Sequence, residues 1–545
     1  MGRLLGWLGG KLRGFLGLFL PVLQKVRGSG GMPGWLRIAV HVLVVLLLLA
    51  GLFALNQLPA ILVLIPRRPL LARSWLPILF LLLYALCWLS YWLWALLVAE
   101  EDGPRFADID AAWDEALTAL RQAGLHISDL PLYLLLGQPE DTEPALFQAA
   151  QLSLVVKQTP PRPDVPLHVY ASRDAIYLPC AGASLLGRHA RFLAGQLPEQ
   201  AMPARGQPAR EDDILTSTIS PATAGATDPS AGTVADIAKV LHQAELEGRP
   251  LTRVEKRELR FLYRQSQPQR SPLKDIELIT YEAARLQYVC RLLREARHPF
   301  CAVNGVLLLL PFAGCDSDQD AIFTAEALQR DLAVTTSVLG VDCPHYALVC
   351  DLETAHGFGE LIQRFPPRER LRRLGQSCPL MPDLQASRAG KEGAARMLDG
   401  LARWICQSVV PTWVYRKFQV EKADTPERAA LIHTNQRLFL LADELQERAK
   451  RLSTILTRGL AGKAVAGPLL FGGCYLAGTG GDPEKEQGFV RGVMDRLTEG
   501  QSCVYWTQQT LKEEASYARW VAIGWTSLGI AILFLLAVGG YFWYG

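Results

Sequence analysis

Three apolar stretches constrain this chain more than any other feature of its sequence. They cover residues 36–57, 76–99 and 520–543, and each reaches the roughly 20 apolar residues that a helix needs to cross a bilayer. Half of the 545 residues are hydrophobic, which is more than an ordinary soluble protein of this size carries. We therefore expect a membrane protein with three transmembrane helices, in which residues 36–99 form a hairpin.

Basic residues predict the orientation of these helices. Six lie before or at the start of the first stretch, against three in the hairpin loop, while two precede the last stretch and no charge follows it. By the positive-inside rule, this pattern places the N-terminus and residues 100–519 in the cytoplasm. Residues 1–35 also mix apolar with basic side chains, which predicts an amphipathic segment on the inner leaflet, with a disordered basic tail as the alternative. The basic residues are Arg3, Lys11, Arg13, Lys25, Arg27 and Arg37 near the N-terminus, Arg67, Arg68 and Arg73 in the hairpin, and Lys512 and Arg519 before the last stretch.

The composition argues against nucleic acids and metals as ligands. The formal net charge of +3 is nearly balanced, so no nucleic-acid partner is expected. The eleven cysteines stand singly and lack the spacing of metal ligands, so we expect neither a metal site nor a disulfide framework. Cys343 and His345 lie close together at the start of an apolar strand, where packing is a simpler role than metal binding.

One short stretch has the outline of a phosphate-binding loop without its chemistry. Residues 130–137 read as a buried strand that runs into a tight turn and then a helix. A functional loop of the form G-x-x-x-x-G-K-[ST] needs a second glycine, a lysine for the phosphates and a hydroxyl for Mg²⁺. Aligned on Gly137, this chain has Thr142, Glu143 and Pro144 at those three positions. A carboxylate would repel the phosphates and the proline removes a backbone donor, so the loop is not expected to bind a nucleotide in the usual way.

Two further elements of a nucleotide site are altered in the same way. In P-loop GTPases a strand ends in D-x-x-G, whose aspartate holds the shell of the Mg²⁺ ion. Here Pro179 takes the place of the aspartate, while Gly182 is retained. In a GTPase, the strand over residues 341–350 would end in [NT]-K-x-D, whose aspartate pairs with guanine. In this chain Asp351 and Glu353 follow the strand, and the lysine is absent.

The remaining pattern predicts the domain organisation. Strands that alternate with helices over residues 100–358 predict a cytoplasmic α/β domain with a parallel sheet, similar to a P-loop NTPase. Within it, residues 196–270 are expected to be a partly disordered insertion. Residues 198–236 are rich in Pro, Ala, Gly, Ser and Thr and should be mobile, and a helix is expected over about 234–264. Residues 359–465 predict a helical extension, and residues 466–519 should return the chain to the α/β domain and the membrane.

Taken in order, these landmarks resemble the N-terminal half of the TssM/IcmF family, the inner-membrane component of type VI secretion systems. Members of that family have a basic N-terminus, a transmembrane hairpin, a cytoplasmic P-loop-like domain with a helical extension, and a third span that leads to a periplasmic region. The matching stretches are residues 130–139, 178–182, 298–306, 339–346, 357–379 and 473–475.

The resemblance implies a scaffold subunit of a type VI secretion-like, contractile injection system. It would pass several times through the bacterial inner membrane, and its pseudo-NTPase domain would dock other membrane-complex or baseplate subunits in a homo- or hetero-oligomer. We expect no enzymatic activity, no catalytic residue and no cofactor. Since the chain stops at Gly545, the periplasmic region of the family is expected to be missing. The degenerate positions of the nucleotide site are Gly137, Glu143, Pro144, Pro179, Gly182, Asp351 and Glu353.

Other functions stay open at this point. A membrane-anchored GTPase or ATPase with a divergent nucleotide site is the main alternative, and it depends on the two glycines and on the carboxylates of Asp351 and Glu353. A transporter is less favoured, because His41 is almost the only ionisable residue in the predicted spans. An unrelated membrane adaptor is the third alternative.

Overall fold

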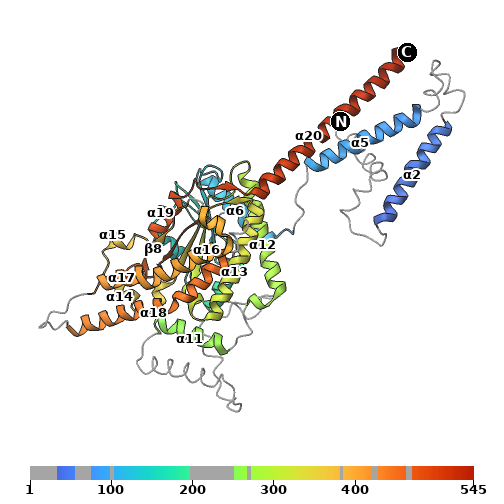
Figure 1. The fold of residues 1–545 in the computed structure, drawn as a ribbon. Helices are drawn as coiled ribbons and strands as arrows, with labels where there is room; N and C mark the ends of the chain where they lie inside the picture. Colours follow the sequence, from blue (N-terminus) through green and yellow to red (C-terminus); the bar gives the residue numbers. More distant parts are fainter. Residues whose placement is uncertain are drawn as a thin grey trace. The chain divides into compact units, whose positions relative to one another are not determined.

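The computed structural model describes residues 34–55, 75–97, 104–196, 251–266, 272–380, 384–418, 428–461 and 469–544. The chain forms two compact units (Figure 1). One comprises Met1–Asp102 with Leu511–Gly545, and the other comprises Gly103–Thr510. Nearly all of the predicted amphipathic segment 1–35 lies outside the described residues, and so does most of the insertion 196–270.

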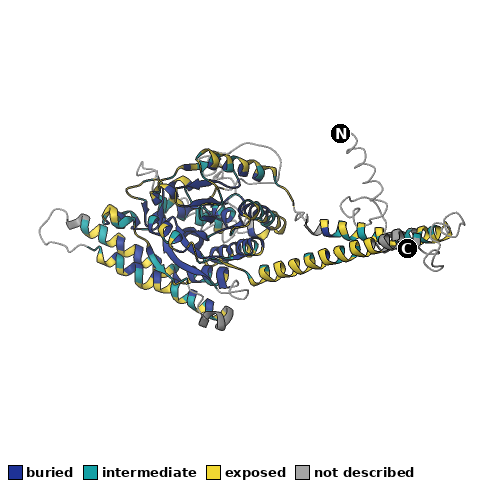
Figure 2. Ribbon diagram, turned by 90° about the horizontal axis from the view of Figure 1, so that it is seen from above, coloured by how far each residue is buried: buried dark blue, intermediate teal, exposed yellow. Residues whose placement is uncertain are grey.

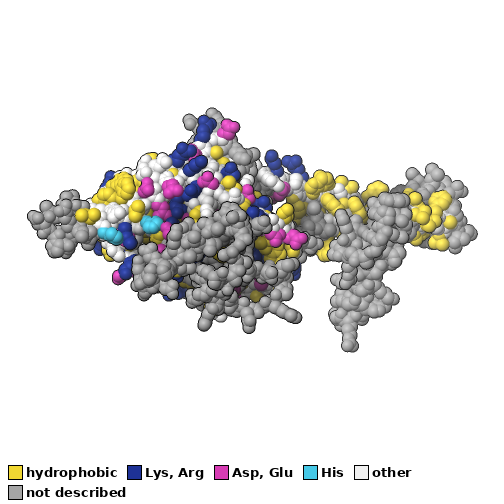
Figure 3. Space-filling model, turned by 90° about the horizontal axis from the view of Figure 1, so that it is seen from below, with side chains coloured by type: hydrophobic (Ala, Val, Ile, Leu, Met, Phe, Trp, Pro, Cys, Tyr) yellow, Lys and Arg dark blue, Asp and Glu magenta, His cyan; other side chains and the backbone are white. Residues whose placement is uncertain are grey.

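The first unit holds the apolar helices α2 (Gly34–Leu55), α5 (Trp75–Leu97) and most of α20 (Gln508–Tyr544). Leu76–Trp94 and Gln508–Phe534 are long and apolar enough to cross a membrane. Few of their described side chains are buried, as the yellow and teal ribbon of Figure 2 shows, and Figure 3 shows hydrophobic side chains on the surface of this unit. Such a surface suits helices that face lipid. The third predicted crossing, residues 36–57, is helical in α2, and its passage through a membrane stays a prediction.

Contacts between aromatic and small residues join α5 to α20 within this unit. The rings of Trp92 and Trp520 meet edge to face, with centroids 6.3 Å apart. Gly524 faces Leu93 so closely that an added Cβ would lie 2.8 Å from the leucine side chain. Small residues that let helices approach in this way are typical of helix packing in membranes.

An eight-stranded mixed sheet forms the centre of the second unit. Its order is β2-β3-β4-β1-β5-β7-β9-β8, in which β4, β1, β5, β7 and β9 are parallel and both edges are antiparallel. The predicted parallel sheet is therefore confirmed at its centre, and the antiparallel edges are an addition. The strands are β1 (Leu132–Gly137), β2 (Val156–Thr159), β3 (Val169–Ala171), β4 (Ile176–Pro179), β5 (Gly305–Pro311), β7 (His345–Cys350), β8 (Leu374–Ser377) and β9 (Phe471–Leu476).

The sequences of the central strands explain their place. β1, β5 and β7 are almost continuous apolar runs, and every residue in them is buried. Strands without polar alternation need cover on both faces, which is the arrangement of doubly wound α/β domains. β8 differs, because only its first residue is buried and it lies at the edge of the sheet. It comes from residues 359–465, so this predicted helical extension also contributes a strand.

Helices cover the sheet and build the extension. α18 packs on both α13 and α16, α13 packs on α8 and α12, and α19 packs on α7. The helices of this unit are α6 (Ala107–Gln122), α7 (Glu143–Ala150), α8 (Leu185–Leu193), α11 (Arg253–Ser266), α12 (Ile276–Arg297), α13 (Asp318–Leu339), α14 (Phe358–Gln363), α15 (Pro367–Arg370), α16 (Leu384–Trp404), α17 (Val410–Arg416), α18 (Arg428–Leu460) and α19 (Arg491–Glu499). Short turns of 3-10 or π-helix lie at Pro272–Lys274, Phe312–Cys315 (η4), Leu352–Thr354 (η5) and Ile405–Val409, and short strands form the pairs β10 (Gly478–Thr479) with β11 (Gln487–Gly488) and β6 (Val341–Asp342) with β12 (Tyr505–Trp506).

Candidate functional site

The carboxyl ends of the parallel strands define the candidate site. From β1 the chain continues through β2 and β3 to β4, which pairs with one side of β1. It then continues to β5, which pairs with the other side of β1, so the strand order reverses at β1. In open α/β sheets, ligands bind in the crevice outside the carboxyl ends at such a point. Gly137 ends β1, Pro179 ends β4 and Asp351 follows β7, so the structure brings these predicted positions to one edge of the sheet.

The loop after β1 is a tight connection into α7. Gly137 has a φ of +94°, and a Cβ added there would lie 2.1 Å from the carbonyl oxygen of Leu309 in β5. Thr142 caps α7, and its hydroxyl accepts a hydrogen bond from the backbone N–H of Ala145 at 3.4 Å. Pro144 lies in the first turn, where a helix makes no use of the backbone N–H that proline lacks. The local sequence thus encodes a stable helix start, and the glycine is required by contact with the neighbouring strand.

Glu143 is neutralised by a residue that the sequence did not single out. Its Oε2 lies 2.7 Å from Nδ1 of His168, and both side chains are less than a tenth exposed. Nε2 of the histidine lies 2.8 Å from the carbonyl oxygen of Arg162. Burial has the largest single effect and lowers the pKa of His168. The hydrogen bond and the charge of Glu143, together with the hydrogen bond to the carbonyl group of Arg162, outweigh it, so the pKa is raised. The position where a phosphate-binding loop has a lysine therefore holds a buried carboxylate paired with an imidazole.

This pair predicts a pH-dependent loss in the Glu143→Gln variant. A raised folded pKa means that the stabilisation is fully present below the unfolded histidine value of about 6.5 and is lost as the pH rises through the folded pKa. We expect the variant to lose about 2 kcal/mol at low pH, and the difference from the wild type should shrink as the pH increases. Thermal unfolding of the full chain across this pH range measures the difference. Glu115→Gln is the matched control, because Glu115 pairs with Arg162 in an exposed position. A similar pH profile in both variants would contradict the assignment.

Asp351 and Glu353 act as acceptors that hold the edge together. Oδ1 of Asp351 accepts from the backbone N–H of Glu140 at 2.8 Å and from the hydroxyl of Thr479 at 3.0 Å. Oε2 of Glu353 accepts from the backbone N–H of Thr479 at 2.9 Å. Burial raises the pKa of Asp351 to about 8, and burial together with the nearby Asp351 raises that of Glu353. Both carboxylates thus connect the loop after β1, the end of β7 and the start of β10.

Helix α11 places a row of four arginines at this edge. Arg253, Arg257, Arg260 and Arg264 follow the spacing i, i+4, i+7, i+11, so they share one side of the helix, which we call the arginine face. Arg253 makes two hydrogen bonds of 2.8 Å to the carboxylate of Asp141 and one of 2.6 Å to Glu486. Arg260 pairs with Glu140. The arginine face therefore binds the loop after β1 and the turn before β11.

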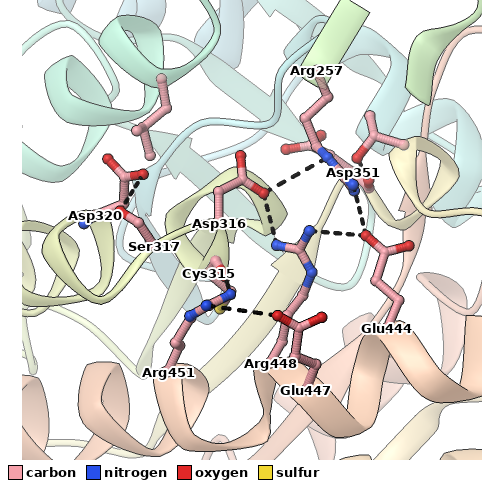
Figure 4. A network of polar contacts seen from close by, with 12 residues as sticks. Arg257, Cys315, Asp316, Ser317, Asp320, Asp351, Glu444, Glu447, Arg448 and Arg451 are labelled. Carbon is pink, nitrogen blue, oxygen red and sulfur yellow. Dashed lines mark hydrogen bonds and ion pairs between the residues drawn. The ribbon is translucent and has the colours of Figure 1, made fainter. Parts of the chain in front are cut away.

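The other two arginines of this face, Arg257 and Arg264, enter a buried network, in which Figure 4 shows Arg257 beside Asp316 and Glu444. Asp316 lies 2.7 Å from Arg448, 3.1 Å from Arg264 and 3.7 Å from Arg257. Glu444 of α18 lies 2.6 Å from Arg257 and 2.8 Å from Arg448. The network thus joins α11, the start of α13 and α18 beside the carboxyl ends of the strands.

Electrostatics explain how this network is stable. Burial raises the pKa of Glu444, but hydrogen bonding from His356 and the guanidinium groups of Arg257 and Arg448 outweigh it, so the pKa is lowered. Both guanidinium groups also lie over the ring of Phe312, at 5.2 Å and 4.5 Å from its centroid. Each buried cation therefore has both a carboxylate and an aromatic face beside it.

Helix α11 lies within the predicted insertion. Residues 196–270 are expected to be partly disordered with a helix over about 234–264, and the structure has α11 at Arg253–Ser266. This helix contacts several parts of the domain through its ion pairs. The sequence analysis did not single out its four arginines, and the signal that could have found them is their spacing, which is typical of one helical face.

The side-chain geometry offers no metal site within the described part of the chain. Over the residues that the structure describes, no group of three or more His, Cys, Asp or Glu side chains could hold a metal ion. Cys343 and His345 are both buried, beside and within β7.

Fold and site together define a doubly wound α/β domain in which ion pairs of the domain close the carboxyl ends of the parallel strands. The same chain also carries apolar helices of membrane-spanning length. Residues 280–511 match the sequence model of the IcmF-related N-terminal domain. The chain thus carries an IcmF-related N-terminal domain, which confirms the predicted relation to the TssM/IcmF family. No curated protein and no solved structure matches the chain. The matched region begins within α12 and ends in α20, so Asp351 and Glu353 lie inside it, whereas β1–β4 and α11 precede it.

Proposed function

We propose that this protein is an inner-membrane scaffold subunit of a type VI secretion-like, contractile injection system. Its α/β domain docks other subunits and does not turn over nucleotides. The IcmF-related domain supports the kind of system, and the apolar helices support the membrane location. The observation that carries the proposal is the closed carboxyl edge, where arginines and carboxylates of the chain occupy the place of a ligand.

The chemistry of this edge is unsuited to phosphoryl transfer. Such a reaction depends on cations and a metal that neutralise the charge of the phosphates. Glu143 is the residue at the position of the lysine, and its negative charge is directed at His168. The cations of α11 already pair with carboxylates of this domain, and Arg191 of α8 donates a hydrogen bond to the side chain of Gln138, directly after Gly137. A triphosphate would have to displace those carboxylates and find its metal ligands elsewhere.

The residues that favour a GTPase or ATPase have other roles. Gly137 is required by its contact with Leu309, and a Cβ added to Gly182 would lie 2.5 Å from the carbonyl oxygen of Val165. Asp351 and Glu353 accept hydrogen bonds from neighbouring parts of the domain. Close packing and hydrogen bonding therefore account for the four features on which the alternative depends.

The membrane topology belongs to the same proposal. Basic residues before the first and last apolar stretches support a cytoplasmic N-terminus and a cytoplasmic α/β domain. A cytoplasmic α/β domain would face the subunits that assemble on the inner surface of the membrane. We propose a homo- or hetero-oligomeric assembly there, because the family resemblance implies a multisubunit complex.

Two measurements on the full chain in detergent test the function. Fluorescent analogues of GTP and ATP with Mg²⁺ are expected to show no saturable binding up to millimolar concentration. Affinity purification from cells that express the secretion genes is expected to recover other membrane-complex or baseplate subunits.

Each measurement has an outcome that would overturn the proposal. Nucleotide binding that Asp351→Asn abolishes and Asp318→Asn leaves unchanged would establish the nucleotide alternative, because Asp318 is exposed and lies outside the edge. Purification without any secretion subunit would reject the scaffold role.

A further inference from the structure

Helix α11 is held in place mainly by ion pairs. Among its apolar side chains only Leu259 is fully buried, while Val254, Phe261 and Leu262 are partly exposed. Its strong contacts are the ion pairs of the arginine face. A helix attached mainly by ion pairs can detach at a cost below that of global unfolding. Salt weakens its more exposed pairs, those of Arg253 and Arg260, more than the buried pairs of Arg257 and Arg264.

The partners of the arginine face come from separate parts of the domain and form one surface, which we call the acidic edge. They lie in the loop after β1, at the start of α13, in α18 and in the turn before β11. Arg448 of α18 pairs with Asp316 and Glu444. Glu140, Asp141 and Glu486 would repel one another without a cation between them, so this part of the surface needs a basic guest. The acidic edge consists of Glu140, Asp141, Asp316, Asp320, Glu444 and Glu486.

The fit between α11 and the acidic edge is incomplete. Among the described residues, Nη1 of Arg257 and Nε of Arg264, both in α11, are buried without a hydrogen-bond partner. Over the same part of the chain, Oδ2 of Asp351 is buried without a partner, while its other oxygen accepts from the backbone N–H of Glu140. Unsatisfied buried groups are costly, so a guest that donated a hydrogen bond to Asp351 and left none of its own buried nitrogens unpaired would bind more favourably than α11 does.

We propose that the acidic edge is a docking site for an arginine-bearing helix, that α11 occupies it within the chain, and that a helix of a partner subunit competes for it. The partner helix would present arginines at the spacing i, i+4, i+7, i+11. Arginine suits this surface better than lysine, because its planar fork can bind a carboxylate through two hydrogen bonds, as Arg253 does with Asp141. This inference rests on the proposed scaffold function, since it assigns the surface through which one subunit docks.

A peptide with the sequence of residues 251–266 provides the probe. The peptide carries a fluorophore and its binding to the full chain in detergent is measured by anisotropy. The wild type should bind it weakly, because α11 occupies the acidic edge. The double variant Arg253→Gln, Arg260→Gln should release α11 and increase the affinity for the peptide at least ten-fold. These two arginines are chosen because they are more exposed than Arg257 and Arg264. Raising NaCl from 50 to 500 mM should weaken this binding more than ten-fold.

Two controls identify the surface and the guest. Adding Glu140→Gln and Asp141→Asn to the released variant should remove the gain in affinity. A peptide with its four arginines replaced by glutamine should not bind, and one with four lysines should bind less tightly. Equal affinity for the wild type and the released variant would overturn the proposal, and so would binding that does not depend on Glu140 and Asp141.

Hydrogen exchange on the wild type tests the attachment of α11 without any substitution. The amides of α11 should exchange at least ten-fold faster at 500 mM NaCl than at 50 mM, while those of β5 and β7 remain unchanged. Protection of α11 that is insensitive to salt would also overturn the proposal. If these tests fail but secretion subunits still co-purify with the protein, the docking site is rejected and the scaffold function stands. The two proposals can therefore be distinguished.

Discussion

Replacing Asp316 with asparagine is expected to lower the free energy of unfolding by about 3 kcal/mol or more. The side chain is only 4% exposed and lies within 4 Å of three guanidinium groups, those of Arg257, Arg264 and Arg448. Asparagine keeps the shape and removes the charge, which leaves buried cations with too few carboxylates. Denaturant unfolding of the full chain in detergent, followed by tryptophan fluorescence, measures the loss.

Asp318 provides the matched control two residues away. It pairs with Arg451 at 3.3 Å, but its side chain is 75% exposed. Surface ion pairs contribute little, so Asp318→Asn should change the free energy of unfolding by no more than about 0.5 kcal/mol. If both variants lost the same amount, burial would not be what makes the Asp316 network important. The Asp316→Asn variant should also show faster hydrogen exchange in α11, because Arg257 and Arg264 both lose a partner.

The central sheet could be predicted because its strands are buried on both faces. The strands β1, β5 and β7 are continuous apolar runs, and such runs predict parallel strands covered by helices. The alignment on Gly137 was informative for a related reason. Parallel strands bring their carboxyl ends to one edge, so residues that follow separate strands, such as Pro179 and Asp351, were expected to lie together there and do so.

The ion pairs that close this edge could not be predicted in the same way. Arg253 and Asp141 are 112 residues apart, and Arg257 and Glu444 are 187 residues apart. The arginine spacing predicts a charged helical face, but a solvated face has the same spacing. Which carboxylates it meets depends on tertiary packing. The partner of Glu143 was missed for the same reason, because nothing near His168 in the sequence distinguishes it from a histidine on a strand end.

The loop after β1 gives the second large expected effect. Gly137→Ala should lower the free energy of unfolding by at least about 3 kcal/mol, which would strongly reduce the amount of folded protein. The new Cβ would lie 2.1 Å from the carbonyl oxygen of Leu309 and 3.2 Å from Leu186, and the φ of +94° is strained for any residue but glycine. Backbone atoms of β5 cannot move away without breaking the pairing of β1 with β5.

Gly124→Ala separates the two causes of this effect. Gly124 also has a positive φ, of +71°, but a Cβ added there would have no atom within 4 Å. This control should therefore lose only about 1 kcal/mol, the usual cost of a left-handed conformation for alanine. Thermal unfolding of both variants measures the difference. If Gly137→Ala were as stable as Gly124→Ala, the loop would have unoccupied space beside β5. A closed edge would then no longer explain why Gly137 is present, and a ligand that approaches the backbone there would become the better explanation.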